Sequence, residues 1–124
     1  MDTNKTKNDR STLSATTLIG DPVVNRNGEN LGKIEDLMIE PELGRVSYAV
    51  LSFGGFLGMG NKLFAVPMQA MRLSREDKRF VLDVDKDRLK NAPGFDKDHW
   101  PDFADPAYGN KLYAYYGYQY PTGH

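Results

Sequence analysis

Tight-turn signals that recur through residues 17–85 are the feature of this sequence that most restricts its fold. The pair Asn27-Gly28 is the strongest short-range hairpin signal, because both residues adopt positive φ at low cost. In residues 40–44, a proline fixes φ early in a turn and a glycine is free to take the left-handed position. Pro67 cannot donate a hydrogen bond to a sheet, so it should end a strand. The sequence therefore predicts short strands joined by tight turns.

The runs between these turns have the composition of β-strands. β-Branched and aromatic residues dominate them, and the run RVSYAVLSF is apolar on both faces. Five to six short strands with almost no helix between them indicate an all-β, antiparallel meander. A sheet this small with apolar side chains on both faces is best satisfied by closing into a small antiparallel β-barrel, which also removes exposed edges. The runs are DPVVN, LGKIEDLMIE, RVSYAVLSF, NKLFAVP, MRLS and RFVLDVD.

Composition divides the 124 residues into one domain with two appendages. Residues 1–15 lack hydrophobic periodicity and are predicted to form a flexible polar arm. Residues 16–85 are predicted to hold the barrel. Residues 86–124 are predicted to form one short helix, with Asp85 as its cap and a Pro-Gly pair as its end, followed by an irregular, Tyr-rich extension.

Charge and cysteine content disfavour several function classes. With a formal net charge of −1, the chain has no electrostatic excess to hold a polyanion, so nucleic-acid binding is disfavoured. The absence of cysteine removes disulfides, thiolate nucleophiles and cysteine-type zinc sites. The two histidines, His99 and His124, have no orienting partner in the sequence. We therefore predict no catalytic residue, no cofactor and no metal, and we do not expect an enzyme.

The stretch FGGFLGMG at residues 53–60 combines four glycines with the most apolar run of the chain. It does not match a phosphate-binding P-loop, because it leads into a strand and lacks the terminal Gly-Lys-Ser/Thr. Two interpretations stay open for it. It is either a hairpin loop whose side chains fold back onto the barrel, or a contact surface formed by Phe56, Leu57 and Met59. Membrane insertion would require several flanking cations, and only Lys62 is close.

Four segments in register resemble the PRC-barrel domain family. They are GENLGKIEDLMI, PELGRVSYAVL, GGFLGMG and FAVP, within residues 16–85. The resemblance implies the small barrel found in the photosynthetic reaction-centre H subunit, in the ribosome maturation factor and in many small stand-alone bacterial proteins. We expect neither the membrane helix of the first nor the upstream domain of the second, because a short polar arm stands before the residues that resemble the barrel. The resemblance therefore implies a fold, and a non-enzymatic module that docks on other macromolecules.

Six of the seven tyrosines fall in the last seventeen residues. Three interpretations stay open for them: packing on the barrel or on a partner subunit, disorder, and stacking on nucleic acid, which the low charge disfavours. A barrel of about 70 residues is small for a single core, so the extension or a second copy is expected to add buried area. We predict a homodimer with contacts from the glycine-rich stretch at residues 53–60 and from the C-terminal extension. The predicted contact residues are Phe56, Leu57, Met59, Trp100, Tyr113, Tyr115 and Tyr116.

We predict a cytoplasmic protein, because the N-terminal residues are polar and no stretch approaches the ~18 apolar residues of a membrane span. Its predicted function is that of a protein-interaction module with an unidentified protein partner. Two alternatives follow from the resemblance: an adaptor on ribosomal or other RNA-containing assemblies, and an accessory protein of photosynthesis or stress responses. A small-ligand carrier is disfavoured, because side chains normally fill small barrels.

Overall fold

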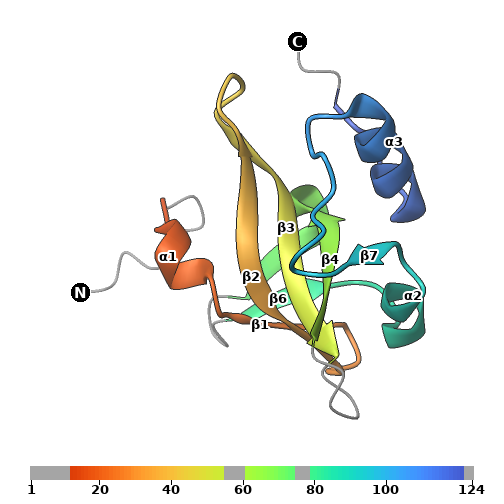
Figure 1. Ribbon diagram of the computed structural model, residues 1–124. Coiled ribbons are helices and arrows are strands. Elements are labelled where there is room, and N and C mark those ends of the chain that lie inside the picture. Colours follow the sequence, from red (N-terminus) through yellow and green to blue (C-terminus); the bar gives the residue numbers. More distant parts are fainter. Residues whose placement is uncertain (1–11, 55–60, 75–78, 122–124) are drawn as a thin grey trace.

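The computed structural model describes residues 12–54, 61–74 and 79–121 (Figure 1). Most of the predicted polar arm lies outside these ranges, and so do Phe56, Leu57 and Met59. The chain is mostly β, as predicted. In chain order the elements are α1 (Ala15–Leu18), β1 (Pro22–Val24), β2 (Asn30–Glu40), β3 (Arg45–Gly54), β4 (Asn61–Pro67), the 3-10 helix η3 (Met68–Ala70), β5 (Met71–Ser74), β6 (Arg79–Leu82), α2 (Lys86–Lys90), β7 (Gly94–Phe95) and α3 (Pro106–Tyr115).

The predicted turns join the strands that the sequence indicated. β1 and β2 pair antiparallel across a turn that contains Gly28, whose φ is +82°. Asn25 holds this turn, because its side-chain oxygen accepts hydrogen bonds from the backbone N–H groups of Asn27 and Glu29 at 3.0 and 2.9 Å. β2 and β3 pair antiparallel across the proline-containing turn, and β3 pairs antiparallel with β4. Local turn chemistry thus accounts for the central strands of the sheet.

The seven strands form one sheet in the order β5-β6-β1-β2-β3-β4-β7, which differs from the prediction in three respects. The described residues contain seven strands instead of five to six, because the C-terminal segment adds β7 beside β4. The meander is not wholly antiparallel, because β1 and β6 pair in parallel. Among the described strands, β5 and β7 do not pair, so the curled sheet is not closed into the predicted barrel. β7 occupies the edge of β4 that closure would have required.

β3 is covered on both faces, in agreement with its apolar composition. Every residue in the range 47–53 is buried. Successive side chains of a strand point to opposite faces. Leu51 lies between Ile34 on β2 and Phe64 on β4 and belongs to the main hydrophobic core. Tyr48 points to the other face, where residues of the C-terminal segment pack against its ring.

The C-terminal segment contains a helix, which corrects the prediction of an irregular extension. α3 is ten residues long and packs beside β3 and β4 (Figure 1). Its start is fixed by Asp105, whose carboxylate accepts a hydrogen bond from the N–H of Ala107 at 3.0 Å, and by Pro106 in the first turn. Gly109 and several tyrosines give this segment a low helix propensity. Tertiary packing overrides that propensity, since Leu112 and its neighbours on one helix face are buried in the core.

The short helix predicted after residue 85 is α2. Asp85 occupies its N-cap position, but the Asp85 side chain makes no capping hydrogen bond. Arg88 of α2 stacks over the Tyr115 ring, with 4.4 Å from the guanidinium carbon to the ring centroid. The Tyr115 hydroxyl donates to the Arg88 carbonyl oxygen at 2.6 Å, and the Arg88 guanidinium donates to the Tyr115 carbonyl oxygen. These reciprocal contacts fix the end of α3 against α2.

Candidate functional site

A bulge in β3 provides an anchoring point for α3. The β2–β3 register shifts between Met38 and Ile39, which leaves Ser47 as an extra residue on β3. The extra residue of a bulge leaves the hydrogen-bond ladder, so its carbonyl group needs another donor. The hydroxyl of Tyr113 on α3 supplies this hydrogen bond at 2.6 Å in buried surroundings. The helix is therefore attached to the strand at one defined position.

Tyr48 is the centre of a group of rings that joins β3 to the C-terminal segment. Its ring centroid lies between 5.0 and 6.3 Å from four other rings. The Tyr48 and Tyr113 rings meet edge to face at 85°, an arrangement that aromatic pairs prefer. We call these five residues the aromatic cluster: Tyr48, Phe103, Tyr108, Tyr113 and Tyr120. Because Tyr48 is fully buried beneath the other four, the aromatic cluster forms part of the core.

Burial keeps the phenols of the aromatic cluster neutral. It raises the pKa of Tyr113 to about 12 and the pKa of Tyr108 to about 12. The pKa of Tyr48 is also raised, by burial first and then by the neighbouring phenols of Tyr120 and Tyr113. Burial and the hydrogen bond with Glu40 raise the pKa of Tyr120. None of these four phenols can exchange a proton near neutral pH, so their role is packing and hydrogen bonding.

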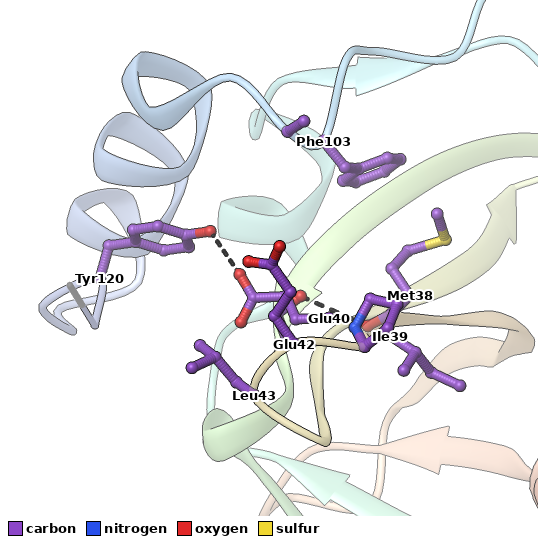
Figure 2. Close-up of a pocket in the computed structure, with 10 residues that line it drawn as sticks. Met38, Ile39, Glu40, Glu42, Leu43, Phe103 and Tyr120 are labelled. Atoms are coloured by element: carbon purple, nitrogen blue, oxygen red, sulfur yellow. Dashed lines mark hydrogen bonds between the residues drawn. The ribbon is translucent and has the colours of Figure 1, made fainter. Parts of the chain in front are cut away.

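A groove of about 690 Å³ opens beside the aromatic cluster, between the β2–β3 turn and the C-terminal segment (Figure 2). This volume lies within the ~300–1,000 Å³ range of pockets that enclose ligands. Ile39 and Leu43 are 59% and 41% exposed, so an aliphatic edge of the groove is uncovered. Exposed apolar surface around a concave site is typical of a contact surface. The apolar residues of the lining are Met38, Ile39, Pro41, Leu43, Phe103 and Ala104.

The charged groups that line the groove are two carboxylates, and one of them, Glu40, is held in place by hydrogen bonds. Glu40 accepts a hydrogen bond from Arg45 Nε at 2.8 Å and another from the Tyr120 hydroxyl at 2.9 Å (Figure 2). These two bonds connect the turn to the C-terminal segment and fix the shape of the groove between them. Glu42 is exposed at the turn. The described residues of the lining include no histidine or lysine, and the Ser47 hydroxyl donates to the Met38 carbonyl oxygen at 3.3 Å. The groove therefore offers shape and apolar area.

The structure places the predicted contact residues in different surroundings. Tyr113 and Tyr116 are 2% and 9% exposed within their own chain, so we leave both out of the contact surface. Tyr115 is half-buried beside Arg88. Trp100 is 39% exposed and remains available for a contact. The glycine-loop residues lie outside the described residues: Phe56, Leu57 and Met59.

Sequence reasoning missed Ile39 and Leu43, the two large aliphatic side chains of the groove that are exposed. A signal for Leu43 was present, because a large aliphatic side chain in a tight turn has no core to enter. Ile39 carried no such signal. It follows Leu37 and Met38 in a short apolar run of β2, and such a run does not indicate which of its side chains the fold leaves exposed.

The described parts of the chain contain no group of three or more His, Cys, Asp or Glu side chains that could hold a metal ion. No helix in these parts is long and apolar enough to cross a membrane.

Comparison with known proteins identifies one family. Residues 11–89 match the family model of the PRC-barrel domain, whereas β7 and α3 lie beyond the match. No curated protein matches the chain. Among solved structures, the chain is similar to RimM of Pseudomonas aeruginosa, a protein assigned to 16S ribosomal RNA processing. The two sequences are 17% identical, the TM-score is 0.41, and the match covers 62% of this chain and 46% of the RimM chain. This chain thus corresponds to less than half of RimM.

Proposed function

The chain belongs to the PRC-barrel domain family, and on this basis we propose that it is a non-enzymatic protein-interaction module that associates with a second copy of itself. A fold does not define a function by itself, so the proposal must be supported by a site. The groove beside the β2–β3 turn is that site.

The proposal rests mainly on the groove, which is lined mostly by apolar residues and has exposed apolar side chains at its edge. Its two sides are joined by the bond from Tyr120 to Glu40, and Ile39 and Leu43 remain exposed at its edge. A contact surface that is already ordered loses little conformational freedom on binding, which favours association. The neutral phenols of the aromatic cluster and the absence of a histidine from the described lining give the groove no acid–base pair.

A second copy is the partner that fits the charge and size of the chain. A formal net charge of −1 produces little repulsion between two copies. A sheet of this size has a small core, and association is one way to bury more apolar area. The contact surface that we propose consists of the groove edge, the exposed Trp100, the half-buried Tyr115 and the glycine loop. Its residues are Ile39, Leu43, Phe56, Leu57, Met59, Trp100 and Tyr115.

Sedimentation velocity of the full chain over a series of concentrations tests the proposal. We expect the average mass to rise with concentration towards twice the mass of one chain. A single monomeric species at every concentration would contradict self-association. A gel shift with ribosomal RNA at ~100 mM salt tests the adaptor alternative, because binding through phosphates would be visible there and would weaken steeply with salt.

A further inference from the structure

We propose that the glycine loop of one copy, residues 55–60, inserts into the groove of a second copy, and that the two copies are related by a two-fold axis. The inference rests on the proposed self-association and specifies its geometry. The occupant of the groove is then a named segment of this same chain. Three observations support it: the chemistry of the two surfaces, the reach of the loop, and their positions on β3.

The chemistry of the loop matches the lining of the groove. Residues 55–60 have the sequence GFLGMG, which contains three large apolar side chains and no charged group. The groove has six apolar lining residues and a volume of about 690 Å³. Glu40 is already bonded to Arg45 and Tyr120, so an uncharged segment can enter without leaving that carboxylate unpaired. Small glycines in the loop allow its backbone to come close to the walls of the groove.

The loop cannot reach the groove of its own chain. β3 has ten residues, and at ~3.3 Å per residue its two ends are about 30 Å apart. The groove lies beyond the Arg45 end of β3, next to the β2–β3 turn. The loop connects Gly54 to Asn61, which pair directly with each other. A six-residue connection with adjacent ends can extend only about 12 Å, at ~3.5 Å per residue along each arm. Insertion must therefore take place between molecules.

The opposite positions of the loop and the groove on β3 determine the symmetry. Suppose that a two-fold axis relates the two copies so that their β3 strands run in opposite directions. The loop end of each copy then faces the groove end of the other. This arrangement forms two identical contacts and closes the assembly at two chains. A head-to-tail arrangement would form the same contact only once per pair and would continue into open chains.

Complementation between two variants tests the inference. The groove variant carries Ile39→Asp and Leu43→Asp, and the loop variant carries Phe56→Asp and Leu57→Asp. The control variant carries Leu13→Asp and Ile19→Asp, whose side chains are 42% and 40% exposed but do not line the groove. Each chain is studied at full length by sedimentation velocity, alone and in equimolar mixture, with a fluorophore on one partner of the mixture.

Loop-in-groove contact predicts a specific set of masses. The wild type and the control variant form dimers, whereas the groove variant and the loop variant each dissociate roughly tenfold more easily or are fully monomeric. Their mixture forms a heterodimer, because the intact loop of one variant meets the intact groove of the other. That heterodimer is weaker than the wild-type dimer, since it retains one of the two contacts.

Other results separate this inference from the proposed function. If the wild type is a dimer but the mixed variants do not associate, loop-in-groove contact is wrong while self-association stands. The same conclusion follows if either double variant dimerises like the wild type. If the wild type is monomeric throughout, both the inference and the proposed self-association are overturned. Circular dichroism and thermal unfolding establish that each variant is folded; for one that is not, the Asp changes are replaced by Ser at the same positions.

Discussion

The aromatic cluster and the groove lie next to each other between the sheet and the C-terminal segment, and both contain large apolar side chains. They differ in how far their own chain covers them. Tyr48 and Tyr113 of the aromatic cluster are 0% and 2% exposed, whereas Ile39 and Leu43 at the groove are 59% and 41% exposed. The C-terminal segment therefore completes the core around Tyr48 and leaves Ile39 and Leu43 uncovered.

The reason for the difference lies in where the C-terminal segment is attached. Tyr113 reaches the free carbonyl oxygen that the β3 bulge leaves at Ser47, and Tyr120 reaches Glu40 at the beginning of the turn. Beyond Glu40 the turn extends away from the remainder of the sheet, as Figure 1 shows. Ile39 and Leu43 remain 59% and 41% exposed, and this apolar area is the surface that we propose for a partner.

The largest expected effect comes from removing the centre of the aromatic cluster. Tyr48→Ala should lower the free energy of unfolding by about 3–5 kcal/mol, because four rings lose their common neighbour in a buried position. Tyr48→Phe is the matched control. It keeps the ring and its packing and removes only the hydroxyl, so the loss of stability should be much smaller than for Tyr48→Ala. Urea unfolding measures both, and an equal loss in the two variants would contradict the packing role.

Alkaline pH should act on several phenols of the aromatic cluster together, and we rank its effect second. The pKa of Tyr113 and the pKa of Tyr108 are raised from 10.0 to about 12 in the folded chain, so the folded state holds these protons more tightly than the unfolded state. Their contribution to stability is complete below pH 10 and is lost as the pH rises from 10 towards 12.

Urea unfolding at a series of pH values, with tyrosinate absorbance followed in parallel, checks this expectation. The free energy of unfolding should fall over the same range in which the buried phenols ionise. Ionisation of all tyrosines at their ordinary pKa, with unchanged stability, would show that the aromatic cluster is not buried as described.

A smaller effect is expected from removing one hydrogen bond of the aromatic cluster. Tyr113→Phe keeps the ring but leaves the buried Ser47 carbonyl oxygen without its donor, and should cost about 1–3 kcal/mol. Tyr118→Phe is the control, because Tyr118 is 39% exposed. Chemical denaturation measures both variants. A loss no larger in Tyr113→Phe than in Tyr118→Phe would mean that the bulge does not anchor α3.

The smallest effect on stability is expected at the groove. Ile39→Ser and Leu43→Ser should each change the free energy of unfolding by no more than about 0.5 kcal/mol, because both side chains are exposed in the single chain. Measured at concentrations where the chain is monomeric, this result would complete the contrast with Tyr48. A loss of several kcal/mol would show instead that the turn is part of the core.

The sequence predicted the strands and their turns because both depend on local chemistry. Asn27-Gly28 and the proline turn set the β1–β2 and β2–β3 hairpins, and the run after residue 45 is apolar on both faces because both faces are covered. The parallel pairing of β1 with β6 could not be predicted in this way. It joins segments more than 50 residues apart, and no local pattern in either segment specifies it.

α3 illustrates a signal that was present but outweighed by composition. Asp105 followed by Pro106 is a helix-start pattern, whereas Gly109 and the tyrosines that follow argue against a helix. The segment is helical because the sheet offers a surface on which Leu112 and Tyr113 are buried. The groove could be predicted only in part, since its two sides come from β2 and from residues more than 60 positions later.

The central claim is that the C-terminal tyrosines belong to the core of one chain and that contacts between chains involve the groove. Nuclear magnetic resonance of the full chain at increasing concentration tests it most directly, with the methyl groups of Ile39 and Leu43 and the rings of Tyr113 and Tyr116 observed in the same sample. We predict that the methyl signals shift with concentration while the signals of the two rings stay constant. Ring signals that shift while both methyl groups remain unchanged would contradict the claim.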